Sequence, residues 1–140
     1  MKTRTIWLVA LALLPGFGLT GVSSTSAHAD GGQGGSAQTR VRINLTGPAI
    51  GRFIPKGYAD FRTAGVQRQL NVEVENVNLT DGTILAAKVN GAPVGMLTLK
   101  LGRAEVELNT KNGAAVPVIQ KGDVVTIVAA NGAIVESGTF

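Results

Sequence analysis

The stretch "VQRQLNVEVE", residues 66–75, alternates apolar and polar side chains with a period of two. Its apolar residues Leu70, Val72 and Val74 fall on one side of an extended chain, and the intervening polar residues fall on the other. This alternation predicts a β-strand with one face in the core and one face in water. Such strands are typical of antiparallel sheets, because parallel strands are usually apolar on both faces.

The same period recurs in "RVRINLT" (40–46) and "RAEVELN" (103–109), and short turn signals separate the apolar runs. Asn90-Gly91 is the strongest two-residue hairpin signal in the chain. No window has the 3.6-residue apolar period of a helix. The predicted strands cover residues 39–46, 56–63, 66–77, 83–90, 93–101, 103–109, 123–130 and 133–140.

Short strands at this spacing, without helices, are typical of a β-sandwich or a small barrel. We predict an all-β fold: an antiparallel, immunoglobulin-like β-sandwich of seven or eight strands that occupies residues 39–140 as one domain. A true antibody-type domain is excluded, because the chain has no cysteine for its inter-sheet disulfide.

The N-terminus has the order of a secretory signal peptide, with a cationic start, an apolar run from Ile6 to Leu19 and an Ala27-His28-Ala29 site. We predict a signal peptide over residues 1–29 that is cleaved after Ala29, and a flexible Gly-rich tail over residues 30–38. The apolar run is too short, and too broken by proline and glycine, to span a bilayer. The predicted location is therefore secreted or periplasmic, with no transmembrane segment after cleavage.

Composition excludes most catalytic chemistry. Cleavage removes His28, Lys2 and Arg4, which leaves eleven Lys and Arg against nine Asp and Glu. Without His or Cys, the usual nucleophile–base pairs and zinc sites cannot form, and no phosphate-binding glycine motif is present. We predict no catalytic residue, metal or cofactor. A net charge of +2 and few aromatic residues also argue against nucleic acid as a partner.

The absence of histidine predicts nearly constant stability between about pH 5.5 and 8, because no side chain with an ordinary pKa titrates there. A carboxyl group with a strongly raised pKa would break this expectation.

Two sets of oxygen-bearing side chains offer alternatives. Glu73 with Glu75, and Glu105 with Glu107, are carboxylate pairs about 7 Å apart, near the spacing of a glycoside hydrolase. A catalytic acid needs burial, however, whereas these residues fall on the predicted wet faces. The loop from Asn76 to Asp81 has oxygen atoms that calcium could use, but a plain turn explains its composition better. A carboxylate-dependent hydrolase and a surface subunit that self-assembles through its edge strands stay open as alternatives.

A binding surface is the best candidate site in the sequence. Core positions at Ala59 and Phe61 would turn their neighbours outward, and pairing of the first two strands would bring two further arginines beside them. The candidate residues are Arg40, Arg42, Tyr58, Asp60 and Arg62. An exposed tyrosine among arginines suits contact with a glycan or a protein. We therefore predict an exported, non-catalytic binding or structural module whose partner is an envelope protein or a glycan.

The segments "VEVENVNLTDGTILAAKVNGAPVG" (72–95) and "GDVVTIVAANGAIVESGTF" (122–140) resemble a group of small exported bacterial all-β domains. That resemblance implies export and an all-β fold, and it implies no active site. A fainter similarity to chordin-type (CHRD) domains lies in Gly57–Phe61 followed by Leu70, Val72 and Val74. CHRD domains carry a histidine-containing stretch, which this chain lacks after cleavage.

Overall fold

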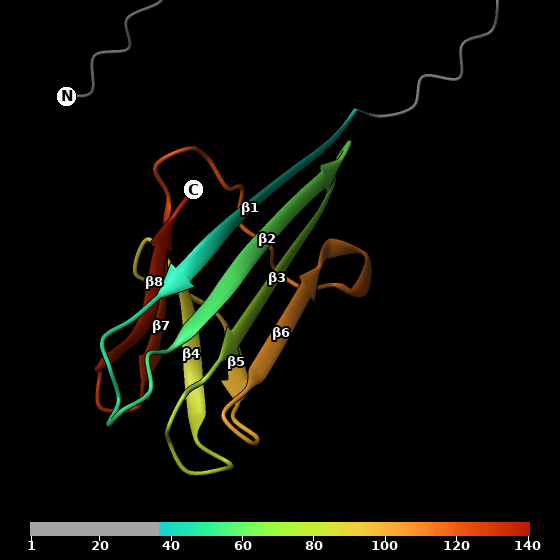
Figure 1. Ribbon diagram of the computed structural model, residues 1–140. Coiled ribbons are helices and arrows are strands. Elements are labelled where there is room, and N and C mark those ends of the chain that lie inside the picture. Colours follow the sequence, from blue (N-terminus) through green and yellow to red (C-terminus); the bar gives the residue numbers. More distant parts are fainter. Residues whose placement is uncertain (1–36) are drawn as a thin grey trace, which may run out of the picture. The chain divides into compact units, whose positions relative to one another are not determined.

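The structure, a computed structural model, describes residues 37–140 (Figure 1). The predicted signal peptide and all but the last two residues of the predicted tail lie outside this range. Every pair of neighbouring strands is antiparallel. The strands are β1 (Gln38–Thr46), β2 (Lys56–Ala64), β3 (Gln67–Glu75), β4 (Ile84–Val89), β5 (Ala92–Thr98), β6 (Ala104–Asn109), β7 (Val124–Ala129) and β8 (Ile134–Thr139), with a short 3-10 helix η1 (Thr110–Asn112).

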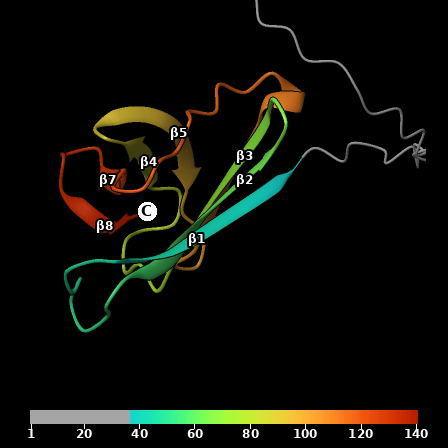
Figure 2. The same ribbon diagram turned by 90° about the horizontal axis from the view of Figure 1, so that it is seen from above.

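The strands form one sheet in the order β5-β4-β7-β8-β1-β2-β3-β6. The sheet curls until its two halves face each other across the core (Figure 2). β1 and β8 join these halves through a single bridge between Thr46 and Ser137. An all-β antiparallel fold of eight strands is therefore confirmed. The arrangement is a nearly closed, barrel-like sheet rather than two clearly separate sheets.

Glycines allow the two halves to meet at the β1–β8 seam. A side chain on Gly138 would lie 2.5 Å from the Asn44 carbonyl oxygen, and one on Gly47 would lie 1.6 Å from the Val135 carbonyl oxygen. Real side-chain atoms do not approach backbone so closely, so any larger residue would push the strands apart. Glycine at these two positions therefore allows the sheet to curl until β1 and β8 meet.

The core follows the predicted alternation. Leu70, Val72 and Val74 on β3 are fully buried, and they pack with residues of the other half such as Leu85 and Ile127. The predicted hairpin at Asn90-Gly91 also forms, with positive φ at both residues. No helix in residues 37–140 is long and apolar enough to cross a membrane.

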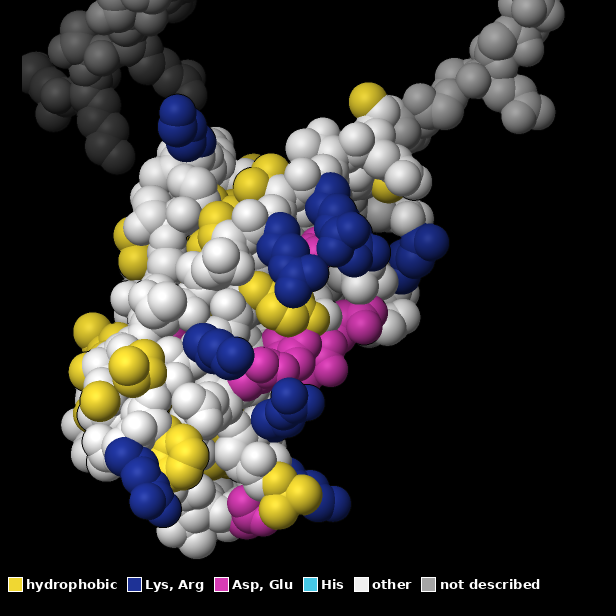
Figure 3. All heavy atoms as spheres, viewed as in Figure 1, with side chains coloured by type: hydrophobic (Ala, Val, Ile, Leu, Met, Phe, Trp, Pro, Cys, Tyr) yellow, Lys and Arg dark blue, Asp and Glu magenta, His cyan; other side chains and the backbone are white. Residues whose placement is uncertain are grey.

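The outward face of β1, β2, β3 and β6 is polar and divided by charge. Arginine side chains lie over β1 and β2, whereas glutamate side chains lie over β3 and β6. Figure 3 shows this division as a dark blue region above a magenta band, with apolar side chains between them. This face holds all five residues that the sequence predicts for binding.

Candidate functional site

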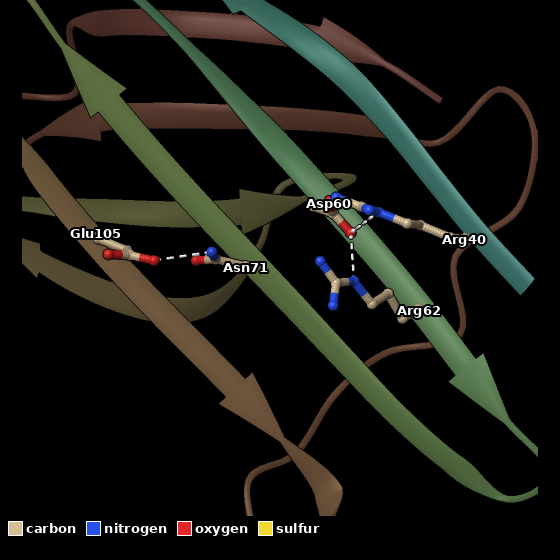
Figure 4. A network of polar contacts seen from close by, with 5 residues as sticks. All are labelled: Arg40, Asp60, Arg62, Asn71 and Glu105. Atoms are coloured by element: carbon tan, nitrogen blue, oxygen red, sulfur yellow. Dashed lines mark hydrogen bonds and ion pairs between the residues drawn. The ribbon is translucent and has the colours of Figure 1, made fainter. Parts of the chain in front are cut away.

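Asp60 organises the basic part of this face. Its side chain is only 3% exposed, although it lies on the outward side of β2. The Nε atoms of Arg40 and Arg62 donate hydrogen bonds to its carboxylate at 2.9 and 3.0 Å, and Arg40 adds a second contact through its terminal nitrogen. Figure 4 shows the two guanidinium groups converging on Asp60 from neighbouring strands. Both arginines are thereby held in fixed positions, and each is still about half exposed.

The electrostatics of this cluster favour the charged forms of its members. Burial alone would raise the pKa of Asp60, but hydrogen bonds from Arg40 and Arg62 outweigh it and hold that pKa below its usual value. The hydrogen bond to Asp60 raises the pKa of Arg40. One carboxylate thus sits beneath two guanidinium groups, so the cluster keeps one net positive charge that is directed outward.

Arg42 and Tyr58 form a second fixed unit beside the Asp60 cluster. The Arg42 guanidinium lies 3.6 Å from the centre of the Tyr58 ring, which is a cation–π contact. Hydrogen bonding to the Glu73 carboxylate, followed by burial, raises the pKa of Tyr58. The tyrosine is therefore held between a basic neighbour on β1 and an acidic neighbour on β3, rather than projecting freely.

A hollow of about 550 Å³ lies beside Arg40 and Arg62, at the end of the strands. Its lining includes four cationic side chains, those of Arg40, Arg62, Arg68 and Lys111, and no acidic side chain. The remaining lining is mostly hydroxyl and amide residues: Gln38, Thr39, Thr63, Ala64, Gln67, Gln69 and Asn109. A hollow of this composition offers hydrogen-bond donors and positive charge to an anionic, hydroxyl-rich molecule.

A second hollow, of about 460 Å³, is lined by Arg42 and Tyr58 together with Lys56 and Glu75. The structure thus brings all five predicted residues onto one face. Arg40 and Arg62 line the first hollow, Arg42 and Tyr58 line the second, and Asp60 lies buried beneath the arginines.

The predicted glutamate pairs lie on the outward face, as expected. Glu105 accepts a hydrogen bond of 2.8 Å from Asn71, and Glu75 pairs with Arg103 at 3.0 Å. Glu73 and Glu105 lie directly opposite each other on β3 and β6. All four carboxylates are partly or fully exposed on this polar face, whereas a catalytic acid needs a buried environment.

The Asn76–Asp81 loop uses its polar atoms to shape its own turns. Asn76 donates to the Ile54 carbonyl, and Asp81 accepts from the Leu101 backbone amide at 2.7 Å. Within residues 37–140, no three His, Cys, Asp or Glu side chains converge as a metal site would require.

Sequence reasoning missed Glu136, which is fully buried at the β1–β8 seam. Neither of its carboxylate oxygens has a hydrogen-bond partner with normal geometry. Burial raises its pKa to about 8; the Glu75 backbone amide opposes this shift, and the Glu75 charge adds to it. The expectation of constant stability between pH 5.5 and 8 is therefore wrong. Because both oxygens are enclosed, Glu136 cannot touch a substrate.

A β-bulge explains why alternation did not reveal Glu136. Val128 pairs with Ile134 and Ile127 pairs with Glu136, so Val135 is an extra residue in β8. The extra residue shifts the alternation by one, and Val135 and Glu136 both point inward. Arg68 was missed because it occupies an inward position on β3, where alternation predicts an apolar residue; its Nε donates to the Val116 carbonyl at 2.9 Å.

The chain matches no protein-family model, and no curated protein matches it.

Proposed function

We propose that this protein is an exported, non-catalytic binding module, secreted or periplasmic, that holds an acidic glycan at the end of β1, β2 and β3 beside Arg40 and Arg62. The observation that carries the proposal is the hollow beside Arg40 and Arg62, which has four cationic lining residues and no acidic one. An anion at this place would meet positive charge from several directions without competing carboxylates in the wall.

The geometry of the arginines supports recognition rather than simple attraction. Asp60 fixes the guanidinium groups of Arg40 and Arg62 before any ligand arrives, so little side-chain entropy is lost on binding. A guanidinium group matches the paired oxygens of a carboxylate or sulfate. The amide and hydroxyl groups of the same hollow suit sugar hydroxyls, and this favours a glycan over a purely ionic partner.

The neighbouring unit of Arg42 and Tyr58 extends the surface. The exposed guanidinium plane of Arg42, stacked on the Tyr58 ring, is a flat platform that suits stacking of a sugar ring or an aromatic side chain. An envelope protein with acidic side chains is the second candidate partner, because it would offer the same anions.

Titration calorimetry with three oligosaccharides tests the proposal: one that carries uronic acids, one that carries sulfates and one that is neutral. We expect binding of the acidic sugars only, weakened by added salt. Arg62→Gln should reduce affinity about tenfold, as loss of a charge-assisted hydrogen bond does. The control Lys121→Gln removes the same charge from a distant turn and should leave affinity unchanged. Equal binding of neutral and acidic sugars would contradict the proposal.

Two finer descriptions also belong to this proposal. The resemblance to small exported bacterial all-β domains is consistent with export, and sequencing the N-terminus of the mature protein would test cleavage after Ala29.

The two four-stranded halves could equally be described as layers of an immunoglobulin-like sandwich, since one bridge joins them at the seam. Crystallographic strand pairing at that seam would decide between a sandwich and a barrel.

A further inference from the structure

Besides β5, which pairs only with β4 and has no charged side chain, two strands of the described domain have long unpaired edges, β1 and β6. β1 pairs with β2 along its whole length, but its one bridge to β8 is at Thr46 and Gly138 of β8 packs against Asn44, so its opposite edge is uncovered from residue 38 to residue 42 within the described chain. β6 pairs with β3 on one side, and no described strand pairs with its other side. In Figure 1, β6 ends the sheet on the right, and the upper half of β1 has no strand beyond it.

The side chains along these two edges are complementary in charge. On the outward face, β1 presents the exposed residues Arg40 and Arg42, and β6 presents the exposed residues Glu105 and Glu107. Two β1 edges, or two β6 edges, would bring like charges together, whereas a β1 edge beside a β6 edge brings opposite charges together.

The inward sides of the two edges are complementary as well. Val41 lies on the inward side of β1, opposite the buried Phe61, and is 41% exposed because no described strand covers this edge of β1. On β6, Val106 and Leu108 are only partly buried. Both side chains pack against the core beside Gly95 of β5, and part of their surface stays exposed. Each edge therefore combines unpaired backbone groups, charged side chains on one face and partly exposed apolar side chains on the other.

We propose that the β1 edge of one copy pairs with the β6 edge of a second copy, which continues the sheet from molecule to molecule. β6 runs antiparallel to β1 within the chain, because three antiparallel pairings separate them. A second copy in the same orientation therefore presents its β1 antiparallel to β6, with the outward faces aligned.

One register satisfies both faces at once. Placing Arg42 opposite Glu105 puts Arg40 opposite Glu107 on the outward face. The same register puts Val41 opposite Val106 on the inward face. The contact is heterologous, since each copy uses a different edge, so addition continues into a chain or a ring. This inference goes beyond the proposed glycan site; it shares Arg40 and Arg42 with that surface, but it depends on the edges rather than on the hollow.

Charge reversal and complementation test the pairing. Sedimentation of the wild-type protein up to about 1 mM should show mass that increases with concentration and decreases with added salt. Arg42→Glu places a glutamate opposite Glu105 and leaves only the Arg40–Glu107 attraction, and Glu105→Arg with Glu107→Arg makes both edges basic, so each variant alone should associate much less than the wild type. Mixed in equal amounts, the two variants should assemble again. Lys88→Glu on β4 reverses a charge away from both edges and should assemble like the wild type.

A cysteine pair tests the register independently of those variants. The chain has no native cysteine, so Arg42→Cys combined with Glu105→Cys should give a ladder of disulfide-linked oligomers under mild oxidation. Arg42→Cys alone should give no species larger than a dimer. A wild type that stays monomeric, a mixture that fails to assemble although both variants are folded by circular dichroism, or the absence of a ladder would each overturn the proposal. Glu105→Arg with Glu107→Arg leaves the hollow intact, so a failure of assembly and a failure of glycan binding can be told apart.

Discussion

Replacing Glu136 by glutamine should remove a pH dependence of stability that the wild-type protein has. In the folded protein, burial holds the pKa of Glu136 at about 8, against an ordinary value of 4.5. Between these two values the folded state keeps the proton, whereas the unfolded state releases it. The contribution of Glu136 to stability is therefore greatest below about pH 4.5, falls as the pH rises and levels off above about pH 8.

The magnitude follows from this difference in pKa. Each pH unit within the window lowers the free energy of unfolding by up to about 1.4 kcal/mol. Between pH 5.5 and 8, the wild-type protein should lose about 3 kcal/mol, since the slope flattens as the folded pKa is approached. That loss is a large part of the stability of an ordinary domain.

Urea unfolding at pH 5.5, 6.5, 7.5 and 8.5 measures the effect. The Glu136→Gln variant keeps the size of the side chain but cannot ionise, so its stability should change little across the series. The comparison uses the change of stability with pH and not the absolute stability, because a buried amide without hydrogen-bond partners itself lowers the free energy of unfolding. Glu107→Gln, on the exposed face, should keep the wild-type slope. A wild-type slope near zero, or an equal slope in Glu136→Gln, would refute the reasoning.

Three further substitutions test the strand register, a turn and the seam. Val72→Asp should lower the free energy of unfolding by at least about 3 kcal/mol, because Val72 is fully buried. Glu73→Gln, one residue on, should change it by less than about 0.5 kcal/mol. Equal effects of the two variants in urea unfolding would mean that the assigned register of β3 is wrong. Leu101 has a left-handed φ of 51° and is 80% exposed. Asparagine tolerates this backbone conformation better than leucine, so Leu101→Asn should raise the free energy of unfolding by about 1 kcal/mol and with it the melting temperature. A lower melting temperature would contradict this. Gly57→Ala should cost at least about 2 kcal/mol in the same assay, because its Cβ would lie 2.0 Å from the Glu73 carbonyl oxygen; wild-type stability would show that the strands can move apart there.

The sequence predicts the strands well because the signal is local. Alternation along residues 66–75 fixes which side chains enter the core, and Asn90-Gly91 fixes a turn through the backbone angles that it permits. All eight predicted strands form, with ends that differ by up to three residues. The pairing of β1 with β2 also follows, because the two strands are neighbours in sequence and present matching faces.

The features that were missed depend on contacts between distant parts of the chain. The inward position of Glu136 arises from a bulge against β7, and the curl of the sheet arises from close approach at Gly47 and Gly138. Neither the bulge nor the close approach can be predicted from the alternation within a single segment. In the same way, the residues Arg40, Arg42, Tyr58, Asp60 and Arg62 were predictable as a surface, but the burial of Asp60 beneath two guanidinium groups was not.

The bridge between Thr46 and Ser137 also bears on the order in which the domain folds. It joins the first described strand to the last described strand, so β1 must wait until residues 47–133 have been synthesised before it meets β8. Closing so long a loop is entropically costly, and contacts between near neighbours such as β1 and β2 form sooner. The hairpin of β1 and β2 is therefore an early structure, and closure of the seam is a late step. A ribosome-bound chain that ends before β8 would hold that hairpin with Leu45 still uncovered, in a state that a chaperone could recognise.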